Sequence, residues 1–378
     1  MSHELCAKNT SLGRHHHGTT PLISFFTSQS SMENMLHLAP CHASVPDCFI
    51  VPPEQLPPTA SAGAASLPVI DLSGSHDEVC RAILDAGKEF GFFQVVNHGV
   101  PEQVLQDMEA LCNEFFELPA QDKAHLYSED RQKPNRLFSG TTYETGGQKY
   151  WMDCLRLACP FPIGDSTSDW PDKPQRLREM FEKFVVLTRG VGMELLRLLC
   201  EAMGLEPDYF DGGLSGGDVI LSVNHYPQCP NPSMILGLPP HCDRNLITLV
   251  HTGPVHGLEV LYNGNWIEVE PIPNAFIVNF GLQLEVVTNG MLKSVEHRVM
   301  TNSTLARTSR AVFIQPKEDC LIGPAEEFLS ENNPPCYRTI TFGDFRRMHS
   351  IVKLRSSLNF TTNLKKTQKN MKIGAKQE

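Results

Sequence analysis

Residues 241–260 read HCDRNLITLVHTGPVHGLEV, and the first three positions raise a question of burial. A histidine and an aspartate, both costly to bury, stand two positions apart beside strand-like apolar sequence. Because residues i and i+2 of a strand point to the same face, His241 and Asp243 can aim at one point while Cys242 turns away. An imidazole and a carboxylate aimed together are typical of two metal ligands, or of a base and its orienting acid.

The composition limits the kind of protein that the chain encodes. Its 378 residues, 41% of them hydrophobic, are enough for one large core or for one core with a smaller helical layer. The net charge of −11 argues against nucleic acid as a partner, since the one dense basic run lies near the C-terminal end. No stretch approaches the roughly 18 consecutive apolar residues of a membrane-spanning helix. We therefore expect neither nucleic acid nor a membrane as partner.

Cysteine usage indicates the cellular compartment. The 12 cysteines form no C-x-x-C motif, and the start of the chain has no apolar segment of the signal-peptide type. Both features favour free thiols in a reducing compartment, so we expect a cytoplasmic protein. The first 31 residues are rich in serine and threonine and contain one acid, Glu4, which leaves a plastid location as the alternative.

The hydrophobic pattern divides the chain into four parts. We expect a disordered tail at 1–34, helices and short strands at 35–215, a β-rich core at 216–350 and a basic tail at 351–378. In the second part, the apolar stripe of residues 174–203 predicts a long amphipathic helix.

The β-rich part is identified by short apolar runs that alternate with glycine, proline and asparagine. Residues 257–270, GLEVLYNGNWIEVE, predict a β-hairpin, because the dipeptide Asn263-Gly264 favours a type I′ turn. The runs AFIVNF and SRAVFIQP predict two further strands.

A metal site needs a third ligand, and three downstream histidines are candidates. His251 and His256 flank a Gly-Pro turn and are expected in a loop. His297 lies in KSVEHRVM, on the apolar face of a predicted strand. A histidine on such a face is more often a satisfied core residue than a ligand, so His297 needs independent support.

That support comes from Arg307 and Ser309, which open a strand ten positions after His297. Arginine does not lose its proton in proteins and needs an anion when it is buried. An arginine and a serine two positions apart on a strand share one face and can together bind a carboxylate.

A rival H-x-E pair occurs at His76 and Glu78. It stands at the start of a predicted helix, where Glu78 completes a capping box with Ser75. Because that pattern explains the glutamate without a metal, the pair is a weaker candidate than His241 and Asp243.

Together these motifs resemble the iron(II)/2-oxoglutarate-dependent dioxygenases of plant specialised metabolism. The motifs follow the order that is typical of the family: H-x-D, then a histidine 56 positions later, then R-x-S ten positions after that histidine. Further similar segments are LPVIDL, GFFQVVNHGV, YWMDCL and NHYPQCPNP, and the resemblance covers about residues 35 to 350. It is strongest to the branch of hyoscyamine 6-hydroxylase and deoxymugineic-acid dioxygenase, which shares Gly281-Leu282 in place of the Gly-Asp of most relatives. His251 is a second departure, because many relatives have glutamine there.

The resemblance implies a mixed, mainly β fold, a double-stranded β-helix or jelly roll with the N-terminal helical region packed on it. It implies iron(II) held by His241, Asp243 and His297, and ascorbate as an activator. The residues that it assigns to 2-oxoglutarate are Arg307, Ser309, Tyr226 and Asn224, and those that it places around the substrate are Phe138, Tyr143, Phe313 and Gln315.

The implied reaction is hydroxylation or desaturation of a small specialised metabolite with O₂, releasing succinate and CO₂. Apolar strands around the metal ligands would keep water away from the reacting atoms. We expect the enzyme to act as a monomer.

Three other interpretations use the same residues. A zinc hydrolase or cupin-like zinc protein could be built on the same three ligands, but it has no use for R-x-S with Tyr226. A non-enzymatic binder on a degenerate dioxygenase scaffold has no use for both an intact triad and an intact R-x-S. An oxygenase that uses ascorbate without 2-oxoglutarate can keep R-x-S. A test of whether turnover requires 2-oxoglutarate distinguishes it from a 2-oxoglutarate-dependent enzyme.

Overall fold

The computed structural model describes residues 45–53, 66–140 and 148–351. The predicted tails, apart from Ile351, and the predicted substrate contact Tyr143 lie outside these ranges. None of the helices in the described ranges is long and apolar enough to cross a membrane.

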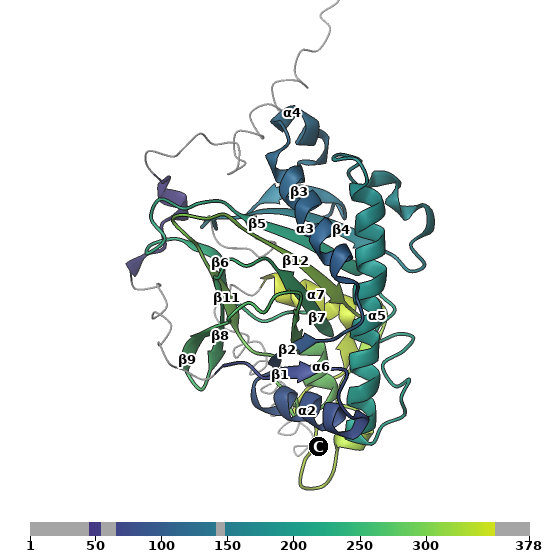
Figure 1. The fold of residues 1–378 in the computed structure, drawn as a ribbon. Helices are drawn as coiled ribbons and strands as arrows, with labels where there is room; N and C mark the ends of the chain where they lie inside the picture. Colours follow the sequence, from purple (N-terminus) through teal and green to yellow (C-terminus); the bar gives the residue numbers. More distant parts are fainter. Residues whose placement is uncertain (1–44, 54–65, 141–147, 352–378) are drawn as a thin grey trace, which may run out of the picture.

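Two β-sheets form the centre of the molecule, and helices cover the larger one (Figure 1). The helices are α2 (His76–Glu89), α3 (Glu102–Glu117), α4 (Ala120–Lys123), α5 (Leu177–Met203), α6 (Leu282–Val287) and α7 (Phe342–Ile351). The strands are β1 (Val69–Asp71), β2 (Phe92–Val96), β3 (Arg136–Ser139), β4 (Asp153–Cys159), β5 (Val219–Tyr226), β6 (Leu236–His241), β7 (Ile247–Thr252), β8 (Leu258–Tyr262), β9 (Asn265–Glu268), β10 (Phe276–Phe280), β11 (His297–Met300), β12 (Arg307–Ile314), β13 (Leu321–Ile322) and β14 (Ile340–Thr341).

The order of the strands is that of a jelly roll. The eight-stranded sheet runs β1-β2-β10-β7-β12-β5-β4-β3, and the four-stranded sheet runs β6-β11-β8-β9. Apolar side chains of both sheets, including Phe92 and Ile277 from the large one and Val260 and Val299 from the small one, pack in one cluster between them. The predicted mainly β core with an N-terminal helical region is therefore confirmed.

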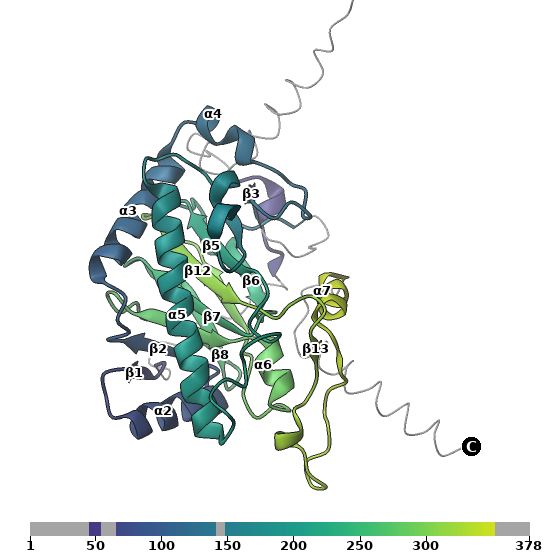
Figure 2. The same cartoon turned by 90° about the vertical axis from the view of Figure 1, so that its right-hand side faces the viewer.

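Helix α5 packs along the outer face of the large sheet (Figure 2). Its apolar stripe is buried as predicted, although the helix begins at Leu177 rather than at residue 174, because Arg176 adopts a left-handed φ of 72°. A Cβ at Gly192 would lie 2.5 Å from Ile314 Cδ1 and 2.9 Å from Leu249 Cδ1, so the helix approaches the sheet closely at this glycine.

The predicted hairpin forms between β8 and β9. Asn263 and Gly264 have φ values of 48° and 80°, the paired positive angles of a type I′ turn. The hairpin continues the small sheet from β11, so it fixes the edge farthest from β6.

His251 does not lie in a loop, contrary to the prediction. It is in β7 and is buried, because the apolar run LITLV continues the strand up to Thr252 and the turn begins only at Gly253. Its Nδ1 accepts a hydrogen bond from Arg310 Nη2 at 3.0 Å. Burial, reinforced by the Arg310 charge, lowers the pKa of His251 to about 3, so the ring is neutral.

Candidate metal centre and carboxylate site

Two neighbouring strands of the small sheet bring the predicted ligands together. His241 is the last residue of β6, His297 is the first residue of β11, and the two are directly paired across the ladder. Asp243 follows two positions after the end of β6. Its Oδ1 lies 3.6 Å from His241 Nε2 and 3.7 Å from His297 Nε2, and all three side chains are buried.

Backbone carbonyls orient both imidazole rings. His241 Nδ1 lies 2.8 Å from the Pro239 oxygen, and His297 Nδ1 lies 3.3 Å from the Val295 oxygen. Because a carbonyl only accepts hydrogen bonds, Nδ1 carries the proton and the Nε2 lone pair faces the shared point. Burial, with His297 acting in the same direction, lowers the pKa of His241 to about 3, so this ring is neutral, the form that binds metals.

Hydrogen bonds also fix the carboxylate of Asp243. Its Oδ2 accepts from Thr248 Oγ1 at 2.6 Å and from Asn279 Nδ2 at 2.8 Å, which leaves Oδ1 to face the histidines. Burial acts to raise the pKa of Asp243, but the two histidines and these hydrogen bonds outweigh it and lower the pKa, so the group is ionised. Sequence reasoning missed both donors, although a single asparagine inside the apolar strand FIVNF could have indicated Asn279.

This donor set fits one first-row metal ion. Two atoms bonded to the same ion at about 2.1 Å each are at most about 4.2 Å apart, and the distances from Asp243 Oδ1 lie within that limit. Two imidazole nitrogens and one carboxylate oxygen on one side of an ion are typical of non-haem iron(II) oxygenases. Cys242 is not part of the set, since its Sγ points to the Ser294 carbonyl, 3.5 Å away.

The segment after β10 supports the loop that carries Asp243. The Leu282 amide donates to the Asp243 carbonyl at 2.8 Å. A Cβ at Gly281 would lie 2.0 Å from the Asn245 oxygen, so only glycine fits this approach. The Leu282 side chain is buried in the main core, so this departure from most relatives leaves the ligand set intact.

Arg307 forms a second site, on the large sheet. It stands opposite Tyr226 across β12 and β5, and its guanidinium lies 5.4 Å from the centre of the Tyr226 ring. Arg307 is buried, yet its Nε and Nη1 have no hydrogen-bond partner in the part of the chain that the structure describes. Burial raises the pKa of Tyr226, so its hydroxyl stays protonated beside Ser309. An orphaned buried guanidinium next to two hydroxyls fits the distal carboxylate of 2-oxoglutarate.

A cavity of about 670 Å³ opens from His241 and Asp243 between the sheets and α7. Asn224 lines it and is the cross-strand partner of Ser309. Phe138, Phe313 and Gln315 also line it, where the resemblance placed them. Its other notable lining residues are the arginines Arg131, Arg136, Arg156, Arg244, Arg346 and Arg347. Sequence reasoning missed these arginines, because they come from distant segments and share no spacing.

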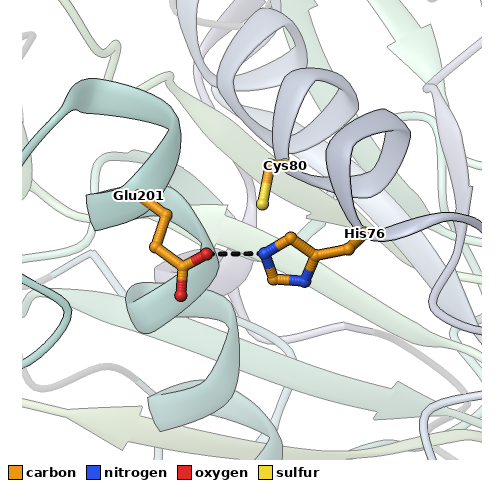
Figure 3. Close-up of side chains that lie close together, drawn as sticks. All are labelled: His76, Cys80 and Glu201. Carbon is orange, nitrogen blue, oxygen red and sulfur yellow. Dashed lines mark hydrogen bonds and ion pairs between the residues drawn. The ribbon is translucent and has the colours of Figure 1, made fainter.

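A second cluster with metal-ligand atoms lies between α2 and α5 (Figure 3). His76 Nε2 is 2.6 Å from Glu201 Oε2, and the sulfur of Cys80, one helical turn after His76, points toward the same gap. Arg197 also binds the Glu201 carboxylate and opposes a cation there, so an ion pair between two helices explains the contact. Glu78 Oε2 accepts a hydrogen bond from Ser75 Oγ at 2.5 Å and takes no part in this cluster. The capping box that the sequence predicts does not form, because the Ser75 side chain makes no hydrogen bond to the backbone of the helix.

The chain matches two known family descriptions. Residues 217–316 match the 2OG-Fe(II) oxygenase superfamily, and residues 67–179 match the N-terminal region described for the non-haem dioxygenase in morphine synthesis. The first match contains all three candidate ligands and Arg307.

Curated relatives agree with this assignment. The chain is 66% identical to 2′-deoxymugineic-acid 2′-dioxygenase of Hordeum vulgare, over 89% of this chain and 99% of the relative. It is 56% identical to mugineic-acid 3-dioxygenase of the same plant, with the same coverage. Hyoscyamine 6-dioxygenase of Hyoscyamus niger is 37% identical over 80% of this chain and 90% of the relative.

Solved structures agree as well. A crystal structure of JOX2 in complex with 2OG, Fe and JA superposes with a TM-score of 0.75 at 35% identity, covering 85% of this chain and 93% of JOX2. The dioxygenase for auxin oxidation in rice, at 24% identity and a TM-score of 0.65, shares the fold. The chain therefore belongs to the 2OG-Fe(II) oxygenase superfamily, and it is a 2-oxoglutarate-dependent dioxygenase.

Proposed function

We propose that this dioxygenase hydroxylates 2′-deoxymugineic acid or a closely similar amino acid that carries more than one carboxyl group. The observation that carries the proposal is the arginine-lined cavity that begins at His241 and Asp243. Guanidinium groups in a partly dehydrated cavity favour carboxylate-bearing substrates and disfavour neutral or cationic ones. Two relatives at 66% and 56% identity are dioxygenases of mugineic acids, which supports the same substrate class.

In this proposal His241, Asp243 and His297 hold iron(II) on one side of the ion. When bound, iron(II) activates O₂ with electrons from the oxidative decarboxylation of 2-oxoglutarate and directs it to a C–H bond. The carbonyls of Pro239 and Val295 keep each imidazole proton on Nδ1, away from the metal.

The residues of the second site have separate roles. Arg307 and Ser309 bind the distal carboxylate of 2-oxoglutarate, and Tyr226 donates a further hydrogen bond. Asn224 stands between this site and the cavity, where it faces the bound co-substrate or the substrate. Phe138 and Phe313 form apolar walls that exclude water from the reacting atoms.

The proposed reaction is a hydroxylation. One oxygen atom of O₂ enters the substrate, converting C–H to C–OH, and the other enters succinate as 2-oxoglutarate loses CO₂. The relative at 66% identity is a 2′-dioxygenase, which supports the 2′ carbon as the reacting position.

The test is turnover of purified enzyme with iron(II), 2-oxoglutarate and ascorbate on a matched set of substrates. The set contains 2′-deoxymugineic acid, mugineic acid, hyoscyamine and a flavanone. We expect succinate and a hydroxylated product in equal amounts from 2′-deoxymugineic acid, with an oxygen atom from ¹⁸O₂ in the new hydroxyl group. Turnover of the flavanone or of hyoscyamine, without turnover of 2′-deoxymugineic acid or mugineic acid, would overturn the substrate assignment.

We also propose that the enzyme acts as a monomer in the cytoplasm. The ten cysteines in the described ranges are all free thiols, which supports a reducing compartment. Light scattering of the purified protein and a fluorescent fusion in plant cells test the two parts separately.

A further inference from the structure

Two arginines stand side by side on neighbouring strands that line the proposed substrate cavity. Arg136 on β3 and Arg156 on β4 are directly opposite partners in an antiparallel ladder, and both line the cavity. Like charges at directly opposite positions destabilise a sheet. This arrangement therefore needs a compensating anion or another physical reason.

No described carboxylate is bonded to either arginine, although the charge of Asp130 acts on Arg136. Neither Arg136 nor Arg156 forms an ion pair with any carboxylate in the described ranges. Arg136 Nη1 donates to the Ser128 carbonyl at 3.2 Å, and the guanidinium stacks 4.1 Å from the centre of the Phe138 ring. Its Nε has no hydrogen-bond partner among the residues that the structure describes. Burial, followed by the charge of Arg244, lowers the pKa of Arg156 to about 10, so the positive charge is held at a cost.

Two other buried arginines of the described ranges differ from Arg136 in having a carboxylate partner, although each also has a guanidinium nitrogen without a hydrogen-bond partner among the described residues. Four arginines in the described ranges are buried, and two of them are paired: Arg298 with Glu259 at 2.5 Å and Arg310 with Glu109 at 3.4 Å. The other two are Arg307, which the co-substrate occupies in the proposed function, and Arg136. A buried guanidinium without a carboxylate thus marks a place where an anionic ligand binds.

At the rim of the cavity the charges are balanced locally. Arg346 is paired with Glu318, and Arg347 with Asp344 at 2.5 Å. These two arginines are exposed to solvent. They therefore attract an anionic substrate toward the cavity but add little to its affinity once it is bound. The uncompensated pair is less exposed, since Arg136 is buried and Arg156 is half-buried.

The sheet register places this pair relative to Asn224 and Ser309. Phe138, Cys154, Asn224 and Ser309 form one row across β3, β4, β5 and β12. Arg136 and Arg156 start the next row on the same face, two residues or roughly 6.6 Å farther along the strands. An anion between the guanidiniums would therefore lie one row beyond Asn224, on the face of the sheet that lines the cavity.

We propose that Arg136 and Arg156 form a carboxylate clamp, a second anion site separate from Arg307, that holds a remote carboxylate of the substrate. The clamp rests on the proposed function in that the substrate carries such a group. Arg156 binds the carboxylate from the cavity side, and Arg136, which is fixed against Phe138, donates a second set of hydrogen bonds to it. A neutral substrate would displace water from both guanidinium groups without replacing those hydrogen bonds, so it would bind less tightly. The clamp thus selects polycarboxylates.

The test compares Arg156→Gln and Arg156→Lys with Arg189→Gln. Arg189 is a suitable control because it stacks on Phe161, 4.6 Å from the ring centre, and does not line the cavity. With 2′-deoxymugineic acid as the varied substrate, we expect Arg156→Gln to raise the substrate KM roughly 30-fold or more, while the co-substrate KM and the iron content stay unchanged. Arg156→Lys should rescue only in part, since an ammonium lacks the planar fork. An unchanged substrate KM in Arg156→Gln would overturn the clamp.

A binding measurement separates this idea from the identity of the substrate. In an Arg307→Ala background, which removes the 2-oxoglutarate site, tricarballylate should still bind in a calorimetric titration. Adding Arg156→Gln to that background should weaken binding roughly 30-fold or more, whereas adding Arg189→Gln should leave it unchanged. Absent binding, or binding that is insensitive to Arg156, would overturn the clamp. Failure of 2′-deoxymugineic acid as a substrate, with this binding intact, would instead overturn only the proposed function.

Discussion

His241 and His297 are directly paired across β6 and β11, although 56 positions separate them in the chain. The pairing sets two imidazoles side by side, with ring centres 4.1 Å apart. Because the strands are held by their ladder and by the apolar cluster between the sheets, the fold itself positions the two histidines. Asp243 then needs only the short turn after β6 to complete the site.

Thr248 should tune the metal site through Asp243. Thr248→Val removes the hydroxyl that donates to Asp243 Oδ2 at 2.6 Å while keeping the shape of the side chain. We expect iron(II) affinity or activity to fall about 10–100-fold, as is usual when a hydrogen bond to a ligand is lost. The measurement is iron(II) titration of the metal-free protein.

A matched substitution provides the control for that titration. Thr188 is buried in α5, and its Oγ1 has no hydrogen-bond partner among the described residues. Thr188→Val should therefore keep wild-type iron affinity. Equal affinities of Thr248→Val and the wild type would show that this hydrogen bond does not orient the ligand.

Cys242 should be irrelevant to the metal even though it stands between two ligands. Its sulfur faces the Ser294 carbonyl and the main core, on the side opposite to the site. We expect Cys242→Ser to bind iron(II) with unchanged affinity, whereas Asp243→Ala should lose it. Metal analysis of the folded variants checks this, and a large loss of iron from Cys242→Ser would mean that the segment is not arranged as described.

His251 should stabilise the protein without taking part in catalysis. It is the neutral acceptor for one N–H of the buried Arg310, so His251→Leu leaves that N–H unsatisfied at a cost of about 1–3 kcal/mol, although Glu109 still contacts Arg310. The midpoint of thermal unfolding should fall by about 1 °C for each kcal/mol, because the entropy of unfolding grows with chain length. His251→Gln retains a hydrogen-bond acceptor, so its unfolding midpoint should fall by less than half as much as that of His251→Leu. Equal losses in the two variants would refute the acceptor role.

The sequence could predict those parts of the site that follow local rules. The i, i+2 spacing of a strand places His241 and Asp243 on one face, and an Asn-Gly turn specifies the hairpin. The prediction that His251 lies in a loop was wrong. A Gly-Pro dipeptide indicates a turn but not where the preceding strand ends, and here β7 continues to Thr252.

Residues that meet only through topology could not be predicted. Arg136 and Arg156 become neighbours through the β3–β4 ladder, and Glu109 reaches Arg310 from a helix 201 positions away. No local pattern encodes either encounter, because each depends on the register between segments that are distant in the chain.

The central claim is that one part of the site holds the metal and another, separate part holds 2-oxoglutarate. Arg307 lies on β12 of the large sheet, whereas the metal ligands belong to β6, β11 and the turn after β6. Removing one partner of a buried charge pair costs about 2–5 kcal/mol, so the apparent affinity for 2-oxoglutarate should fall roughly 30-fold or more in Arg307→Ala. Arg307→Lys should recover only part of the loss.

The most direct measurement is a 2-oxoglutarate titration of substrate-dependent succinate release, with iron content assayed in parallel, for the wild type, Arg307→Ala and His297→Ala. We predict normal iron content with a large rise in the 2-oxoglutarate requirement for Arg307→Ala, and loss of both iron and succinate release for His297→Ala. An unchanged 2-oxoglutarate requirement in Arg307→Ala, or full iron content and activity in His297→Ala, would contradict the account.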